Sequence, residues 1–198
     1  MSEKESTKVK ILKAAKELFI ENGYHDTSMS AIAETADLGK GTLYWHFDSK
    51  SELFQSMISR ETKIILSELN KLANANLKAE EILKKFIKIR LKRIMEHKKT
   101  TQMFMDSENF VNDEFKKTMF KLFQSFIDLL TDTIKQGIKE GCFYTEDPEK
   151  AASAFLGMIN GICTNTLLND EESIDIEESA DFIYELFLNG LKKKEVEN

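Results

Sequence analysis

The sequence predicts an all-helical protein, and three observations support this. Valine, the usual material of buried strands, is almost absent from the 198 residues. Only one proline and eight glycines interrupt a chain that is rich in Ile, Leu, Lys and Glu. Apolar residues recur at the spacing of one helix face over most of the length, which predicts about nine helices and no strand.

Three short helices are expected in the first 50 residues. The first carries apolar residues at helical spacing: Ile11, Leu12, Ala15, Leu18 and Phe19. Gly23 follows where this helix should stop, because glycine readily adopts the left-handed conformation that ends helices. A second helix should begin near Thr27 or Ser28. The tight connection 37–39 then leads into a third helix containing GTLYWHF, residues 41–47.

Six further helices are expected in the rest of the chain. A capping box, Ser49-Lys50-Ser51-Glu52, opens a long helix that runs to about Leu72. The others are expected over residues 79–98, 101–110, 113–140, 148–168 and from about 175 onward. Stop and start signals mark their ends: Gly141, the cap Asp147 with the first-turn proline Pro148, and Asp175 with Glu178.

The short helices before Ser49 differ in kind from the long helices after it. We therefore expect a small domain of residues 1–50 and a larger helical domain of residues 51–198, with the fourth helix shared at its start. The net charge is −6, so any nucleic-acid site must be local. Residues 1–50 hold seven lysines and eight acidic residues, so binding there would need the lysines sorted onto one face.

No catalytic, metal or cofactor site is visible. Cys142 and Cys163 lie far apart, the three histidines are dispersed, and no nucleophile motif occurs. Residues 39–42 lack the spacing and the preceding strand of a phosphate-binding loop. The N-terminus lacks the apolar run of a secretion signal, and no stretch approaches the ~20 apolar residues of a membrane span. We expect a soluble, cytoplasmic protein that is not an enzyme.

Four adjacent aromatic rings in the third helix cannot all face one core. At ~100° per residue, Leu43 and Phe47 project within ~40° of each other, with His46 ~60° to the other side. These three can face the first helix. Tyr44 and Trp45 then point outward, where two exposed rings are unfavourable unless another surface docks on them.

The residues around these two rings suit a docking surface. Gly41 would let a backbone approach closely, Thr42 offers a hydroxyl, and Lys40 and Lys50 offer positive charge. A short helix, a tight turn and a second short helix with an exposed face form a helix-turn-helix, whose second helix lies in the major groove of DNA. The alternative is that the aromatic row packs against the neighbouring domain.

Residues 27–33 and 41–47, followed by Lys50 and Leu53, resemble the N-terminal signature of the tetracycline-repressor (TetR/AcrR) family. The resemblance implies a dimeric transcriptional regulator, usually a repressor, released from a palindromic operator in double-stranded DNA by a small ligand. It places Thr27 and Ser28 at phosphate. It places the following residues at the groove and its backbone: Lys40, Gly41, Thr42, Tyr44, Trp45, His46 and Lys50.

Two positions depart from the family pattern. Asp37 stands where glycine is usual in the turn, and Gly39 stands where serine is usual. Aspartate tolerates the left-handed conformation fairly well, so the turn should still form. The missing serine hydroxyl removes one expected cap or phosphate contact.

Arg90 falls within the apolar stripe of the fifth helix, where a charge needs a partner. One interpretation is an internal ion pair with an acid such as Asp106 or Glu108. The other is an anchor for an anionic ligand. The resemblance places a ligand cavity among the fourth to eighth helices, and their Met/Phe bias suits an apolar or aromatic ligand. The candidate lining residues are Phe86, Arg90, Met103, Phe104, Phe110, Phe115, Met119, Phe123 and Phe126.

The last two helices suggest a dimer interface, as the resemblance implies. Small residues on one face would allow close approach, and apolar residues of the last helix would complete a four-helix contact. The candidates are Ala154, Gly157, Gly161, Ile183, Tyr184 and Phe187. Ordinary packing within one subunit is the alternative. The rival functional classes are a helical small-molecule-binding enzyme and a protein-interaction module without DNA binding.

Overall fold

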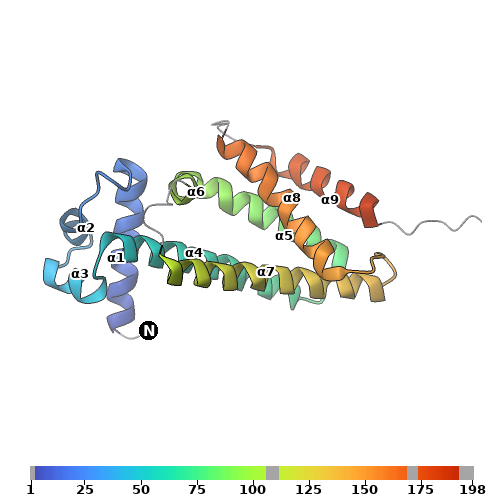
Figure 1. Cartoon of the computed structure of the whole chain (residues 1–198), viewed down its shortest axis with the longest axis horizontal. Coiled ribbons are helices and arrows are strands. Elements are labelled where there is room, and N and C mark those ends of the chain that lie inside the picture. The colour runs from blue at the N-terminus through green and yellow to red at the C-terminus, as the bar shows by residue number, and fades with distance from the viewer. Residues whose placement is uncertain (1–2, 106–111, 169–173, 192–198) are drawn as a thin grey trace, which may run out of the picture. The chain divides into compact units, whose positions relative to one another are not determined.

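The computed structural model describes residues 3–105, 112–168 and 174–191, and every helix or strand in these ranges is an α-helix (Figure 1). The helices are α1 (Glu3–Asn22), α2 (Met29–Thr35), α3 (Lys40–His46), α4 (Lys50–Ala73), α5 (Ala79–Glu96), α6 (Lys98–Met105), α7 (Asp113–Lys139), α8 (Pro148–Leu168) and α9 (Ile176–Leu191). The predicted fold class is confirmed. The expected end of the sixth helix, Phe110, lies outside the described residues.

Helix ends follow the local signals in the sequence. Gly23, directly after α1, has a left-handed φ of 83°. Gly141, two residues after the end of α7, has a left-handed φ of 77°. Three side-chain oxygens accept first-turn N–H groups, as N-caps do. The pairs are Ser28 with Ala31, Asp147 with Lys150 and Asp175 with Glu178, at 3.1, 3.0 and 2.9 Å.

The capping box before α4 is also formed. Ser49 Oγ accepts the Glu52 N–H at 3.1 Å, and Glu52 Oε2 reaches back to the Asp48 N–H at 2.7 Å. Two backbone donors at the start of α4 are thereby satisfied by side chains, which positions the first residue of α4, Lys50.

The turn between α2 and α3 depends on Asp37, which has a left-handed φ of 53°. Its N–H donates to Glu34 O at 2.9 Å, and the Leu38 N–H donates to Ala33 O at 2.9 Å. These two bonds form a Schellman motif, with Asp37 at the position where glycine is most common. The expectation that aspartate supports this turn is confirmed. At Gly39, the N-cap of α3, no side-chain cap bond forms, in line with the missing serine hydroxyl.

The chain divides into two compact units. The first comprises Met1–Thr62 and His97–Met119, and the second comprises Lys63–Glu96 and Phe120–Asn198. Helices α4 and α7 each contribute residues to both units. The expected boundary at residue 50 lies inside the first unit, so the functional division into residues 1–50 and 51–198 remains a prediction.

The core of the first unit joins α1, α2 and α3 to the start of α4. Phe19, Phe47 and Phe54 are fully buried in it, together with Leu43. Phe115 of α7, which comes much later in the chain, is also a buried member of this core. The helix-turn-helix is thus held by apolar contacts on its inner face, which leaves its outer face available.

The core of the second unit contains a tight contact at Gly137 of α7. A Cβ atom at this position would lie 2.1 Å from a ring carbon of Phe143, which is buried in the loop after α7. The same end of α7 supports α5. Glu140 Oε2 accepts the Ala79 N–H at 3.0 Å, and Gln136 Nε2 donates to Leu77 O at 2.9 Å. The hydrogen bonds from Gln136 and Ala79 hold the pKa of the Glu140 carboxyl below its usual range.

Among the described residues, α8 is long and apolar enough to cross a membrane by length and composition. Core helices of soluble proteins pass the same test, and the buried side of α8, with Phe155, Leu156 and Ile159, belongs to the core of the second unit. Its other side carries small residues, which bear on the oligomeric state below.

Candidate nucleic-acid interface and interior sites

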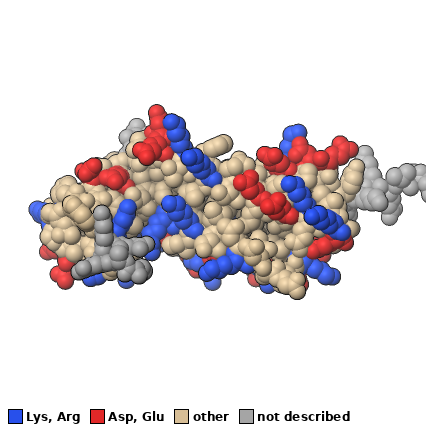
Figure 2. Space-filling model, turned by 90° about the horizontal axis from the view of Figure 1, so that it is seen from below, with Lys and Arg blue, Asp and Glu red and all other residues tan. Residues whose placement is uncertain are grey.

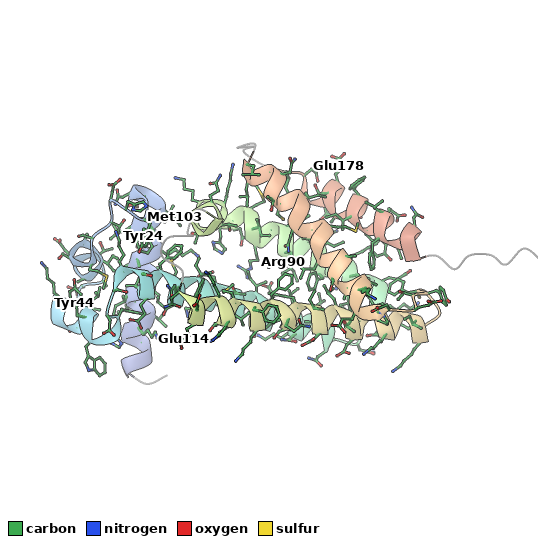
Figure 3. All side chains as sticks on the ribbon, viewed as in Figure 1. Tyr24, Tyr44, Arg90, Met103, Glu114 and Glu178 are labelled. Atoms are coloured by element: carbon green, nitrogen blue, oxygen red, sulfur yellow. The ribbon has the colours of Figure 1, made fainter. Side chains whose placement is uncertain are left out.

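The rings of α3 divide between the two faces of the helix as the wheel predicts. Leu43 and Phe47 are buried, whereas the side chains of Tyr44 and Trp45 are 51% and 65% exposed. The Trp45 ring packs edge-on against His46, with centroids 4.7 Å apart, and His46 is half-buried. The inner face packs α3 against its core through Leu43 and Phe47, and Tyr44 lies on the outer side of the helix (Figure 3).

The exposed residues at the start of α2 and on the outer face of α3 form a set that we name the recognition surface. It consists of Ser28, Lys40, Gly41, Thr42, Tyr44 and Trp45. A Cβ atom added at Gly41 would meet nothing within 4 Å, so the packing of the chain itself does not require glycine there. The absence of a side chain at Gly41 leaves room for another molecule to approach the backbone there.

Thr27 does not belong to this surface. Its side chain is only 2% exposed, and its Oγ1 donates within the protein, at 2.7 Å from Gly23 O and 3.2 Å from Leu18 O. The prediction that Thr27 meets phosphate is therefore wrong for its side chain. The hydroxyl instead ties the start of α2 to the end of α1, and only Ser28 is left exposed at this helix terminus.

Lys50 also has an interior role. Its Nζ donates to the carbonyl oxygens of Tyr24, His25 and Thr27 at 2.7, 3.0 and 2.8 Å, and it lies 4.5 Å from the centre of the Tyr24 ring. An ammonium group has three donors, and all three are used here. These bonds give Lys50 a structural role, and its contact with the DNA backbone remains a prediction. Burial lowers the pKa of Lys50, partly offset by Asp26.

Charge is mixed over the surface. Lys and Arg alternate with Asp and Glu on the face shown in Figure 2, with no broad area of one sign. This agrees with the slightly negative balance of the first 50 residues. Attraction to a polyanion must therefore come from a few placed groups, of which Lys40 is the one on the recognition surface.

Arg90 projects from α5 into the interior of the second unit (Figure 3). The residue as a whole is half-buried, but its Nε is closed off from solvent and has no hydrogen-bond partner among the described residues. Nη2 donates to Asn160 Oδ1 at 3.3 Å, and Cζ lies 4.9 Å from the centre of the Phe126 ring. No carboxylate among the described residues forms an ion pair with it. The predicted partners Asp106 and Glu108 lie outside those residues.

The predicted cavity residues are not brought together. Phe115 is buried in the core of the first unit, where Met103 and Met119 pack against it, whereas Phe86 and Phe126 belong to the core of the second. Phe123 is exposed. The side chains of Phe104 and Phe110 lie outside the described part of the chain. The described members therefore divide between two cores, because α7 contributes to both, and a single lining set remains a prediction.

The predicted dimer residues also divide. Ala154, Gly157 and Gly161 lie exposed on α8, and a Cβ at either glycine would meet nothing within 4 Å. Ile183 and Tyr184 are buried in the core of the second unit, where α9 packs against α5. Phe187 is buried there too, so this half of the prediction is wrong.

The exposed apolar residues of α9 are instead Phe182 and Leu186, at 61% and 53% exposure. Sequence reasoning missed both. Their spacing of four residues was a visible signal, but α9 is apolar on more than one side, so periodicity did not select the face.

Two family models cover most of the chain. The model for bacterial regulatory proteins of the tetR family matches residues 11–57, and that for the tetracyclin repressor-like C-terminal domain matches residues 76–191. The chain belongs to the tetR family. This tetR-family chain is a ligand-responsive, DNA-binding transcriptional regulator, as the signature in its first 55 or so residues implied.

A relative supports this role, and solved structures share the fold. The HTH-type transcriptional regulator QacR of Staphylococcus aureus is 30% identical over 196 residues, covering 94% of this chain and 98% of QacR. A putative tetR-family regulator from Mesorhizobium loti has the same fold, with a TM-score of 0.80 at 24% identity and coverage of 98% and 100%. FadR of Bacillus subtilis, solved with stearoyl-CoA, superposes with a TM-score of 0.76 at 22% identity, covering 93% and 99%.

Proposed function

We propose that the recognition surface docks in the major groove of operator DNA. The observation that supports this most directly is the pair of exposed rings, Tyr44 and Trp45, beside a glycine that internal packing does not require. Tyr44 and Thr42 offer hydroxyl donors, and Lys40 offers charge for phosphate. His46, half-buried behind Trp45, supports the ring rather than reaching the groove.

Replacing Tyr44 or Trp45 by alanine is expected to weaken operator binding at least about tenfold, because each removes groove contacts worth ~1–3 kcal/mol. Both side chains are exposed, so the melting temperature should stay close to that of the wild type. Fluorescence anisotropy on the DNA upstream of the gene measures the affinity, with Tyr144→Ala, another exposed tyrosine, as the control. Unchanged affinity in both variants would remove α3 from the interface.

The regulator acts as a homodimer through α8 and α9. The exposed small residues of α8, Ala154, Gly157 and Gly161, allow a second helix to approach closely, and Phe182 and Leu186 of α9 supply the apolar area. A two-fold arrangement presents two copies of α3. These bind half-sites about one DNA turn, ~34 Å, or a multiple apart, so a palindromic operator is expected.

Changing both Phe182 and Leu186 to glutamate is expected to give a monomer, because like charges would face each other across the two-fold axis. Operator affinity should fall with it, since one half-site contact is lost. Sedimentation velocity gives the oligomeric state, and Phe120→Glu, at an exposed phenylalanine of α7, is the control. A dimer that persists in the double variant would place the interface elsewhere.

Ligand binding in the second unit releases the operator through α4. Within the second unit, Arg93 of α5 bonds Glu68 of α4 at 2.8 Å. Within the first, Glu61 of α4 bonds Lys16 of α1 at 3.2 Å. A displaced α4 would alter the spacing of the two recognition surfaces, and half-site spacing tolerates little change. The stearoyl-CoA bound by FadR supports a ligand with a large apolar part.

The expectation that the chain is not an enzyme accords with relatives that are named as regulators. Binding that falls steeply with salt, as phosphate contacts require, is the expected behaviour on operator DNA. We expect this soluble regulator in the cytoplasm, where the operator is.

A further inference from the structure

The guanidinium of Arg90 is incompletely satisfied by the protein. A guanidinium carries five N–H donors, and Nε here has neither solvent nor an acceptor in the part of the chain that the structure describes. The one described hydrogen bond runs from Nη2 to the neutral amide oxygen of Asn160. A buried cation that lacks an anion is strongly unfavourable, so the arrangement is incomplete as it stands.

The groups around Arg90 do not neutralise it. The Arg90 Cζ atom lies over the Phe126 ring, 4.9 Å from its centre, and this contact compensates for only part of the lost hydration. Cys163 interacts electrostatically with Arg90, but burial raises the pKa of its thiol to about 11, so it remains a neutral thiol at pH 7. Burial also lowers the pKa of Arg90, but an arginine side chain stays protonated in proteins.

Arg93, on the same helix, is an arginine whose guanidinium is hydrogen-bonded to carboxylates. Its Nε and Nη2 donate side-on to Glu68 at 3.2 and 2.8 Å, and its Nη1 bonds Glu96 at 3.3 Å. Arg90 presents the corresponding Nε edge without a described carboxylate. The missing element is therefore an oxyanion that bridges Nε and a terminal nitrogen, as the Glu68 carboxylate does for Arg93.

We infer that Arg90 anchors the carboxylate of an amphiphilic ligand whose apolar part lies among α5, α7 and α8. The surroundings fit this class, because Phe86, Phe126 and Phe155 belong to the same apolar core and Phe86 and Phe155 are 6.2 Å apart. The Phe126 ring contacts the guanidinium, and a planar carboxylate could pair with the Nε–H and a terminal N–H. The inference rests on the proposed ligand response and names the chemistry of its ligand.

Three ten-carbon probes with different head groups test the charge requirement: decanoate, decanol and decyltrimethylammonium. Decanoate is expected to raise the melting temperature of the full-length protein more than the other two. In Arg90→Met the decanoate response should fall to that of decanol, a loss of roughly 10- to 100-fold in affinity, the range of a charged hydrogen bond. Arg90→Lys should retain part of the response, since it keeps the charge but not the fork.

The ligand-free protein gives a second readout. Removing an unpaired buried charge should raise the melting temperature of Arg90→Met by about 2–4 °C. Arg93→Met is the matched control, which loses an ion pair, melts no higher than wild type, and keeps the full decanoate response. If Arg90→Met lowers the melting temperature and Asp106→Asn or Glu108→Gln does the same, Arg90 has an internal partner and the inference is overturned.

Equal decanoate responses in wild type and Arg90→Met would also overturn it. A decanoate response that depends on Arg90, in a protein that binds no DNA upstream of its gene, would contradict the proposed regulator but support the anchor. Specific operator binding without any Arg90-dependent decanoate response would support the proposed regulator and contradict the anchor. The two ideas therefore fail by different measurements.

Discussion

Replacing Gly137 by alanine is expected to destabilise the protein by about 1–3 kcal/mol, although alanine is the better helix former by ~1 kcal/mol. The added Cβ would lie 2.1 Å from the Phe143 ring and 3.0 Å from Ala79 Cβ, far inside contact distance. The ring is buried and cannot swing into solvent without opening the core. Urea unfolding monitored by circular dichroism measures the loss.

Two variants separate steric clash from helix propensity. Gly190→Ala in α9, where an added Cβ would meet nothing within 4 Å, should be neutral or slightly stabilising. Phe143→Ala should be less harmful in the Gly137→Ala background than in the wild type, because both changes act on the same contact. A Gly137→Ala protein as stable as Gly190→Ala would show that the loop after α7 can move away.

Replacing Lys50 by methionine is expected to cost about 2–4 kcal/mol in the free energy of unfolding. Methionine keeps an apolar stem over Tyr24 but leaves three carbonyl oxygens without their charged donor. Hydrogen bonds to charged groups contribute ~1.5–3 kcal/mol each, and water can replace part of this at a half-buried site. The turn between α1 and α2 would loosen, so operator binding should weaken as a consequence.

Lys40→Met is the informative comparison, because Lys40 is exposed on the recognition surface. It should weaken DNA binding and reduce its salt dependence while leaving the melting temperature unchanged. If Lys50→Met behaves in the same way, Lys50 binds phosphate and its bonds to the α1–α2 turn are not important for stability.

Features set by nearest neighbours along the chain were predictable. The helix caps at Ser28, Asp147 and Asp175 depend on one side chain and one N–H three residues later. The inward direction of Leu43 and Phe47 follows from helical geometry alone. These interactions involve sequence separations of three or four residues, which a wheel and a short list of capping residues describe.

The errors concern interactions between distant residues. Lys50 bonds carbonyls 23 to 26 residues away, and no local pattern distinguishes that role from a phosphate contact. The face of α9 was misjudged because Ile183 and Phe182 are equally apolar, and only the position of α5 decides which is buried. No pattern in the sequence indicated that Phe115 and Phe126 of one helix, α7, belong to different cores.

The first compact unit is assembled from two stretches of chain, because Phe115 of α7 is buried against the helices of residues 1–62. DNA-binding domains therefore cannot be exchanged between relatives at a single fusion point. A chimera that transplants only the first 50 residues would place a new surface against the recipient's own Phe115 and Met119. A functional graft should carry residues 97–119 with it, so operator specificity in such proteins is inherited through two separate segments of the gene.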